Sequence, residues 1–241
     1  MRARDLIEAL NVAIQADVPA FIWGVAGIGK SAIIDQLGEK TGMPVVDLRL
    51  ATQEVGDLTG VPYINPDTNT THWAKPSWWL EEDKWILFLD EMNRATTEVL
   101  QAVFPLVRDR RLHTHKLPSG VRIIAAGNPP TKGYVTNVMD EALHTRFMHL
   151  KLDPNWEDFI HGTCDFISPN VLGYIAAAPN QLCNLKSDFD INSVTGATPR
   201  TWDMVDQIHT TLGDKANTNE GRMLLTICAS GLVGSAHAHD Y

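Results

Sequence analysis

The sequence predicts an α/β protein with a parallel, five-stranded sheet and a smaller α-helical domain after it. Short apolar runs alternate with segments of helical periodicity, which is typical of βαβ units. The runs expected to form strands span residues 20–23, 45–50, 85–89, 122–127 and 148–152. After Pro154, strand-like runs fade and helical periodicity takes over. We therefore expect an αβα core over residues 1–153 and a helical lid over residues 154–241.

Local patterns add detail to this outline. Apolar residues every four positions, at Leu6, Leu10 and Ile14, predict an opening helix that stops near Asp17. The turn-rich stretch 65–70 predicts a hairpin insertion near residues 61–75.

Two further patterns concern helices. Pro105 lies within the helix-like run 98–108 and predicts a kink or a break there. Residues 223–239 carry no Asp, Glu, Lys or Arg, and predict a buried helix followed by a turn. That run is shorter than the roughly 20 apolar residues that cross a bilayer, so we expect no membrane association.

Composition narrows the function classes. The 241 residues are 44% hydrophobic and carry 20 Lys and Arg against 29 Asp and Glu, a net charge of −9. The hydrophobic fraction excludes a disordered chain. The negative net charge argues against nucleic acid as a partner, because no overall positive charge attracts phosphates. The three cysteines, Cys164, Cys183 and Cys228, match neither a C-x-x-C pair nor a disulfide framework. With no export signal in the first eight residues, we expect a cytoplasmic protein.

The stretch from Gly24 to Ser31 fits the pattern G-x-x-x-x-G-K-[ST] and lies between a predicted strand and a helix start. Glycines allow backbone N–H groups to surround phosphate oxygens, Lys30 reaches the β- and γ-phosphates, and the Ser31 hydroxyl can ligate Mg²⁺. The pattern predicts ATP and Mg²⁺ as ligands, whereas the alternative is a glycine-rich turn. The expected nucleotide-binding residues are Gly24, Val25, Ala26, Gly27, Ile28, Gly29, Lys30, Ser31 and Ala32.

Polar residues follow two later strands. Asp90 and Glu91 end an apolar strand, and alternation along a strand would point them different ways. One carboxylate would hold the metal, a role we expect for Asp90 with Ser31, and Glu91 would deprotonate a water. The alternative is a solvated pair at a strand end. Asn128 follows another apolar strand, just before Pro129 and Pro130, where its amide could hydrogen-bond water and the γ-phosphate.

With these motifs in place, the sequence resembles the AAA+ ATPases, and among them the MoxR-like group. Besides the glycine-rich loop, the resemblance rests on Asp90-Glu91-Met92-Asn93-Arg94-Ala95, on Asn128-Pro129, on Asp140-Glu141-Ala142-Leu143-His144-Thr145-Arg146-Phe147 and on Ala197-Thr198-Pro199-Arg200-Thr201-Trp202. Residues 57–62 also look like the segment before the helix-2 insert of this group, in agreement with the expected hairpin.

The resemblance implies a role for each of these residues. Lys30 and Ser31 would be the Walker A lysine and hydroxyl, and Asp90 and Glu91 the Walker B pair. Three further residues would act as sensor 1, arginine finger and sensor 2: Asn128, Arg146 and Arg200. Similar proteins form rings, usually hexamers, and many work beside a protein with a von Willebrand factor A domain.

Several readings stay open. Arg94 is a rival to Arg146 as the residue that reaches a neighbour's nucleotide, and Arg146 and Arg200 could be ordinary surface arginines. The basic cluster at residues 108–116 is best read as a solvated connector; a hairpin facing a pore or partner, or a contact to nucleic acid, are the alternatives. The pairs His113/His115 and His237/His239 are expected to be surface histidines rather than metal ligands. Three tryptophans are expected to anchor the core or an interface around the insert: Trp73, Trp78 and Trp79.

The sequence thus predicts a Mg²⁺-dependent ATPase that assembles with its own copies into a ring, expected to be a hexamer, and remodels a protein partner. One alternative is a ring motor on nucleic acid, and another is an assembly switch that binds ATP with little turnover. A small-molecule kinase is the weakest alternative, because it would leave Asn128, Arg146 and Arg200 without a role.

Overall fold

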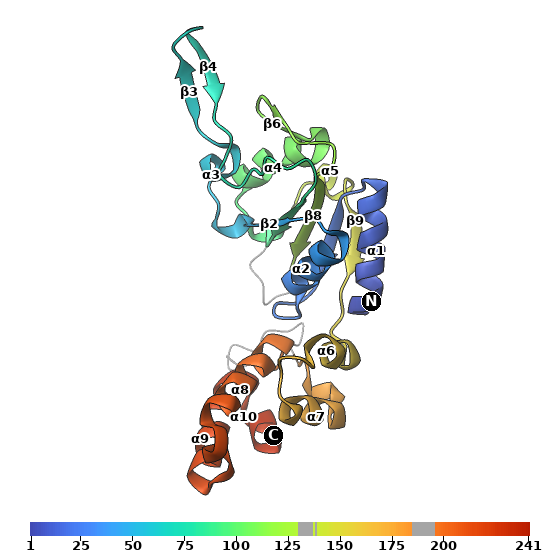
Figure 1. Cartoon of the computed structure of the whole chain (residues 1–241), viewed down its shortest axis with the longest axis vertical. Helices are drawn as coiled ribbons and strands as arrows, with labels where there is room; N and C mark the ends of the chain where they lie inside the picture. The colour runs from blue at the N-terminus through green and yellow to red at the C-terminus, as the bar shows by residue number, and fades with distance from the viewer. Residues whose placement is uncertain (130–136, 138, 185–195) are drawn as a thin grey trace.

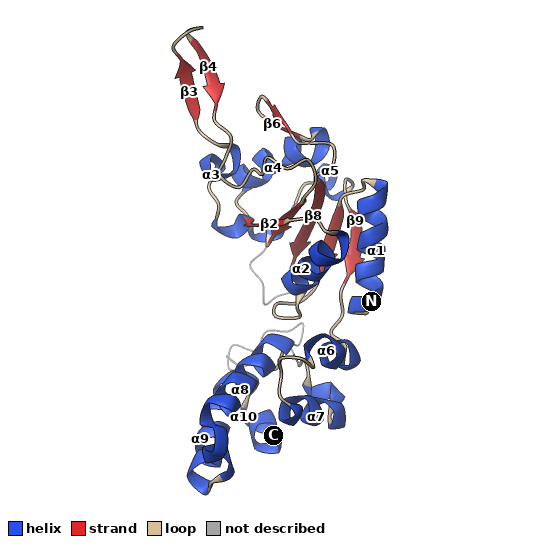
Figure 2. Ribbon diagram, viewed as in Figure 1, coloured by secondary structure: helices blue, strands red, loops and turns tan. Residues whose placement is uncertain are grey.

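The computed structural model describes residues 1–129, 137, 139–184 and 196–241. Pro130, the second proline after Asn128, lies outside the described residues. In the first part of the chain (Figures 1 and 2) the helices and strands are, in order, α1 (Ala3–Ala16), β1 (Ala20–Trp23), α2 (Lys30–Thr41), β2 (Val45–Arg49), η1 (Leu50–Thr52), α3 (Val55–Thr59), β3 (Pro62–Asn65), β4 (Thr70–Trp73), β5 (Ile86–Asp90), η2 (Met92–Arg94), α4 (Thr97–Asp109), β6 (Arg111–Leu112), β7 (His115–Lys116), β8 (Arg122–Gly127), α5 (Glu141–His144) and β9 (Met148–Lys151).

Five of these strands form one parallel sheet in the order β2-β5-β8-β1-β9. This confirms the predicted five-stranded parallel sheet. Each strand begins and ends within one residue of its expected range, because each run is apolar and bounded by residues that stop a strand. In a parallel sheet the carboxyl ends of all strands meet at one edge, where α/β proteins hold their ligands.

Helices cover both faces of the sheet, and the strand side chains divide between the two faces. Helices α1 and α2 cover one face, with Ile22, Phe88 and Ile124 in the apolar cluster between them and the sheet. On the other face, Phe21 and Leu87 pack in a cluster with residues of α3 and α4. The central strands are therefore buried on both sides, which makes them a rigid support for the loops at their ends.

Two antiparallel hairpins extend from the core, β3–β4 and β6–β7. The first confirms the expected insertion, and the second shows that the basic cluster at residues 108–116 includes a hairpin. The hairpins touch: the Trp73 ring stacks on His113 with 3.5 Å between ring centroids, and His115 Nε2 lies 2.7 Å from the Trp73 carbonyl oxygen. Trp79 is buried in the core, and Trp78 donates a hydrogen bond to the Leu58 carbonyl.

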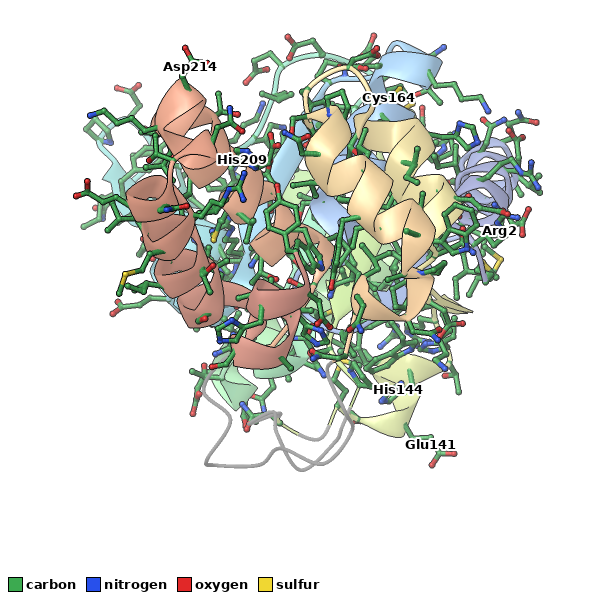
Figure 3. The ribbon with its side chains drawn as sticks, turned by 90° about the horizontal axis from the view of Figure 1, so that it is seen from below. Arg2, Glu141, His144, Cys164, His209 and Asp214 are labelled. Carbon is green, nitrogen blue, oxygen red and sulfur yellow. The ribbon has the colours of Figure 1, made fainter. Side chains whose placement is uncertain are left out.

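The rest of the chain is helical where it is described. Its elements are α6 (Trp156–Thr163), α7 (Pro169–Ala177), η3 (Pro179–Gln181), α8 (Pro199–Leu212), η4 (Gly213–Asn217), α9 (Asn219–Val233) and α10 (Ser235–Asp240). They share an apolar cluster of their own around the buried Trp202, which includes Val171 and Ala229. Figure 3, seen from below, looks onto these helices, with Cys164 and His209 labelled on them.

The structure corrects two expectations about helices. Helix α4 continues through Pro105, so the predicted break is wrong, and the alternative, a kink, stays a prediction. A proline removes one N–H, and the remaining turns are held by packing on the sheet. Helix α9 is not buried throughout, since Met223, Leu224 and Ile227 are 67%, 46% and 57% exposed. Only one side of it, including Ala229 and Val233, faces the helical core. Within the described residues, no helix is both long and apolar enough to cross a membrane.

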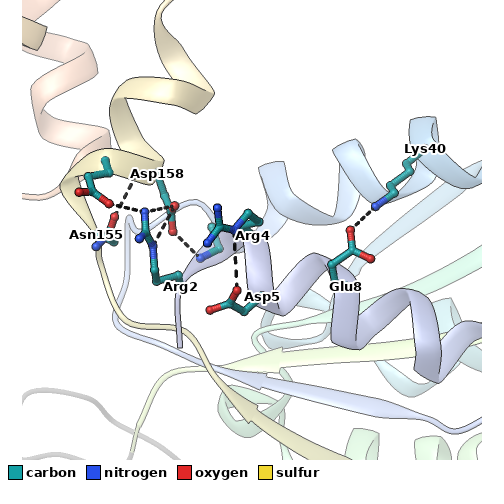
Figure 4. A network of polar contacts seen from close by, with 9 residues as sticks. Arg2, Arg4, Asp5, Glu8, Lys40, Asn155 and Asp158 are labelled. Atoms are coloured by element: carbon teal, nitrogen blue, oxygen red, sulfur yellow. Dashed lines mark hydrogen bonds and ion pairs between the residues drawn. The ribbon is translucent and has the colours of Figure 1, made fainter.

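Polar contacts join the start of α1 to α6 (Figure 4). The Arg2 guanidinium lies 2.6 Å from a Glu157 carboxylate oxygen and 3.1 Å from one of Asp158. The second Asp158 oxygen accepts from the Ala3 backbone N–H over 2.7 Å, and Asn155 caps α6 by accepting from the Asp158 N–H. The first lid helix is therefore attached to the core at the N-terminus of α1.

Candidate active site

A cavity of about 550 Å³ lies at the carboxyl edge of the sheet. Its walls come from the glycine-rich loop, the ends of β5 and β8, helix α6 and the start of α8. The cavity brings together most of the residues expected from the sequence: Ala26, Gly27, Ile28, Gly29, Lys30, Ser31, Ala32, Asp90, Glu91, Asn128 and Arg200. Gly24 and Val25 take part through their carbonyl oxygens, whereas Arg146 does not line this cavity.

The glycine-rich loop connects β1 to α2, and its geometry depends on glycine. Gly27 has φ +77°, a conformation that other residues rarely adopt, and a Cβ atom there would lie 3.0 Å from Thr198 Oγ1. Gly29 occupies the N-cap position of α2, where it offers no side chain to the first N–H groups of the helix. The N-terminus of α2 therefore presents backbone donors and a positive dipole end to the cavity, an arrangement that suits phosphate.

Lys30 is the first residue of α2, and its ammonium makes three hydrogen bonds. It donates to the Gly24 carbonyl over 2.7 Å, to the Val25 carbonyl over 3.0 Å and to Asn128 Oδ1 over 3.0 Å. Burial lowers the pKa of Lys30 to about 8, an effect to which the nearby positive charge of Arg200 adds and which the Asp90 and Glu91 carboxylates oppose. The buried lysine therefore loses its proton at a pH only slightly above neutral.

The two carboxylates at the end of β5 are held differently. Asp90 is the last residue of the strand, is 9% exposed, and lies with its Oδ2 atom 3.4 Å from Ser31 Oγ. Glu91 has φ +52° and has left the strand, so strand alternation does not determine where its side chain points. Its backbone N–H donates to Asp90 Oδ1 over 2.8 Å, which stabilises the turn. The Glu91 carboxylate lies 3.2 Å from the Arg94 guanidinium, at the partly exposed side of the cavity.

Ser31 and Asp90 fit a magnesium ion. Mg²⁺ prefers oxygen ligands, and it is usually bound by one or two protein oxygens together with phosphate and water rather than by a protein cage. A hydroxyl and a carboxylate that already approach each other beside the N-terminus of α2 meet that requirement. Among the described residues, no three or more His, Cys, Asp or Glu side chains cluster to form a metal site made of protein ligands alone.

Asn128 follows β8, is 6% exposed, and directs its side-chain oxygen to Lys30. A residue to which the sequence analysis gave no role holds it there: the Asn93 side chain exchanges two hydrogen bonds with the Asn128 backbone. The only signal for Asn93 is its place two residues after Glu91 in the stretch that carries the family resemblance.

Residues at the start of α8 also line the cavity. The Arg200 backbone N–H donates to the Gly27 carbonyl over 3.1 Å, which joins the start of α8 to the glycine-rich loop. Thr198 caps the helix by accepting from the Thr201 N–H, and Thr201 in turn accepts from the Thr198 N–H. The exposed Arg200 side chain therefore reaches the cavity from a well-formed helix start.

Arg146 lies between α5 and β9, away from the cavity of its own chain. Its guanidinium carbon is 5.1 Å from the centre of the Phe104 ring on α4. Its buried Nε atom has no hydrogen-bond partner within the part of the chain that the structure describes. The cation is thus supported by an aromatic face and keeps unused hydrogen-bonding capacity.

Comparison with known proteins agrees with this architecture. The chain is 27% identical over 184 residues to a protein named midasin from Giardia intestinalis, covering 70% of this chain and 4% of that protein. It is 29% identical over 126 residues to midasin from Dictyostelium discoideum, covering 51% of this chain and 2% of the other. The chain therefore spans only a small part of the length of these relatives.

Solved structures show the same fold. A mutant of RuvB from Thermotoga maritima aligns with a TM-score of 0.59 and 13% identity, covering 95% of this chain and 72% of that one. NtrX from Brucella abortus in complex with ADP aligns with a TM-score of 0.56 and 16% identity, covering 98% and 64%. A putative ATPase from Cytophaga hutchinsonii gives 0.53 and 17%, covering 94% and 68%.

The family follows from the sequence match. The family described as "AAA domain (dynein-related subfamily)" matches residues 19–147, more than half of the chain. That range includes the glycine-rich loop, the carboxylates after β5 and the asparagine after β8. The chain belongs to the dynein-related subfamily of AAA domains, within the AAA+ ATPases.

Proposed function

We propose that the protein binds ATP with Mg²⁺ and hydrolyses the bond between its β- and γ-phosphates. The observation that carries this proposal is that Lys30, Glu91, Asn128 and Arg200 all line one cavity. A phosphate-binding helix end, a carboxylate base and an amide that can orient water are the parts that such a reaction requires.

Each residue has a separate task in the proposed reaction. Lys30 and the N–H groups at the start of α2 bind the phosphates. Glu91 accepts a proton from the water whose oxygen attacks the γ-phosphorus, while Asn128 orients that water; the bond to the bridging oxygen breaks and ADP leaves. Mg²⁺, held by Ser31 and Asp90, would neutralise charge on the phosphate oxygens. Arg200 would sense the γ-phosphate from the lid.

We further propose that Arg146 completes the cavity of a neighbouring copy, so that the active form is a homo-oligomeric ring, hexameric as the MoxR-like resemblance implies. Its absence from the lining of its own cavity supports a contact outside the chain. An arginine added in this way raises kcat roughly 10³- to 10⁵-fold, which corresponds to about 4–7 kcal/mol of barrier. Assembly would then switch hydrolysis on.

The proposed output is the remodelling of a protein partner, for which a protein with a von Willebrand factor A domain is a candidate. In this proposal the core is residues 1–153 and the lid is residues 154–241. Arg200 contacts the glycine-rich loop through its backbone, so a nucleotide bound to that loop would directly influence the position of the lid. The net charge of −9 supports a protein client rather than nucleic acid.

Steady-state hydrolysis of ATP at increasing protein concentration tests the proposal, with mass measured by light scattering in the same samples. We expect activity per chain to rise as the protein assembles. A chain that stays monomeric with ATP and hydrolyses it at full rate would contradict the ring. Binding of ATP with negligible turnover at every concentration would favour an assembly switch, and salt-sensitive stimulation by DNA or RNA would favour a nucleic-acid motor.

A further inference from the structure

Asn93 holds the backbone of Asn128 at two points. The Asn93 Nδ2 group donates to the Asn128 carbonyl oxygen over 2.6 Å, and the Asn128 N–H donates to Asn93 Oδ1 over 3.3 Å. The Asn93 side chain is 3% exposed, so water does not compete for these bonds. One planar amide therefore fixes both polar groups of the residue that follows the strand.

The close approach of the two segments is built into the sequence. Gly127, the residue before Asn128, faces the Asn93 amide, and a Cβ atom at residue 127 would lie 2.6 Å from Asn93 Oδ1. A side chain at this position would push the amide away from the Asn128 backbone. The hydrogen bonds of Asn93 to the Asn128 backbone therefore require glycine at position 127.

The same turn carries the proposed base. Asn93 belongs to η2, the turn that begins directly after Glu91. Through Asn93, this turn is tied to Asn128, and Asn128 Oδ1 accepts from the Lys30 ammonium over 3.0 Å. The position of Asn128 relative to both Glu91 and Lys30 therefore depends on one buried side chain.

We propose that Asn93 is a positioning residue for hydrolysis, which sets where the Asn128 amide stands relative to Glu91. This rests on the proposed ATPase activity. Asparagine is suited to the task because one terminal amide supplies both a donor and an acceptor; aspartate supplies only acceptors, and leucine has a similar size but neither group. Phosphate binding by the glycine-rich loop does not depend on these bonds, whereas the geometry of the attacking water does.

Two variants test the proposal, Asn93→Leu and Asn93→Asp. We expect kcat to fall about 10²-fold, as misplacement of a catalytic group does, while the Kd for ATP changes less than threefold. In an Asn128→Ala background the same substitutions should cost little more, because their effect runs through the Asn128 side chain. Asn137→Leu is the matched control: it removes a side-chain hydrogen bond to Ala95 on the same turn and should leave kcat within threefold.

Amide hydrogen exchange at residue 128 supplies a readout that does not need turnover. Exchange should be at least tenfold faster in both Asn93 variants and unchanged in the control. Unchanged exchange, full kcat, or losses that add to those of Asn128→Ala would overturn the positioning role. If Asn93→Leu fails to fold, the nearly isosteric Asn93→Asp decides by the same measurements. Absence of hydrolysis by the wild type would instead count against the proposed function, and exchange would still decide whether Asn93 holds Asn128.

Discussion

The Lys30 ammonium donates a hydrogen bond to Asn128 Oδ1 over 3.0 Å, so the lysine that begins α2 is joined directly to the residue that ends β8. Two carbonyl oxygens of the glycine-rich loop accept its other bonds. Since an ammonium group has three protons, Lys30 must exchange at least one of these partners to bind a phosphate oxygen. The two loop carbonyls and the Asn128 amide are the three candidates for that exchange.

The lowered pKa of Lys30 predicts a pH-dependent affinity for ATP. Because its pKa is about 8, the lysine is mostly charged at pH 7 and loses its proton as the pH rises through 8. Bound phosphate favours the charged form, so affinity should fall by up to tenfold per pH unit above about 8. A fluorescent ATP analogue titrated between pH 7 and 9.5 measures this. Lys30→Met should bind weakly with no such dependence, and a flat wild-type profile would refute the prediction.

Substitution of the proposed base and the proposed finger should give separable defects. Glu91→Gln should keep ATP affinity and lose roughly 10²- to 10⁴-fold in kcat, because the amide cannot accept the proton. Arg146→Ala should assemble and lose roughly 10³- to 10⁵-fold. Mixing the two variants should restore part of the activity, since a hybrid interface combines an intact Glu91 with an intact Arg146. Full activity of Arg146→Ala alone would contradict the proposed role of Arg146 as an arginine finger.

Arg94 should behave differently from Arg146 in the same mixing experiment. Its guanidinium contacts Glu91 of its own chain, and both side chains are partly exposed, so Arg94→Ala should change stability by less than about 1 kcal/mol. We expect a smaller loss of kcat than for Arg146→Ala. A mixture of Arg94→Ala and Glu91→Gln should hydrolyse ATP no faster than the sum of the two variants measured separately. Recovery equal to that of the Arg146→Ala mixture would make Arg94 the residue that acts across the interface.

The cap of α8 should affect nucleotide binding as well as stability. Thr198→Ala removes the acceptor for the Thr201 N–H and should cost about 1 kcal/mol, measured by thermal unfolding. Because the first turn of α8, at Arg200, contacts the glycine-rich loop, the Kd for ATP should rise severalfold. Thr218→Ala is the matched control, since Thr218 caps α9 in the same way. Equal effects of both substitutions on Kd would argue against a route through α8.

Much of the fold could be predicted because the strands are continuous apolar runs and the loop after β1 matches a specific pattern. The site was harder to predict where it depends on local conformation. The φ angle of Glu91, which removes it from the strand, is accompanied by a hydrogen bond to Asp90 and cannot be predicted from strand periodicity. Asn93 gives no signal of its own, because its partner is the backbone of a residue 35 positions away. The exposed side of α9 was missed because uncharged residues do not reveal which face is covered.

The attachment of α6 to α1 determines how the lid could swing. Arg2 and Asp158 fasten α6 to the core, while the backbone N–H of Arg200 joins α8 to the glycine-rich loop. A rotation that keeps the contact between Arg2 and Asp158 and breaks the one between Arg200 and Gly27 would turn about α6. In the proposed reaction cycle, displacement would grow with distance from α6, so the exposed apolar residues of α9, which lies far from α6 in Figure 1, would move farther than α6 itself.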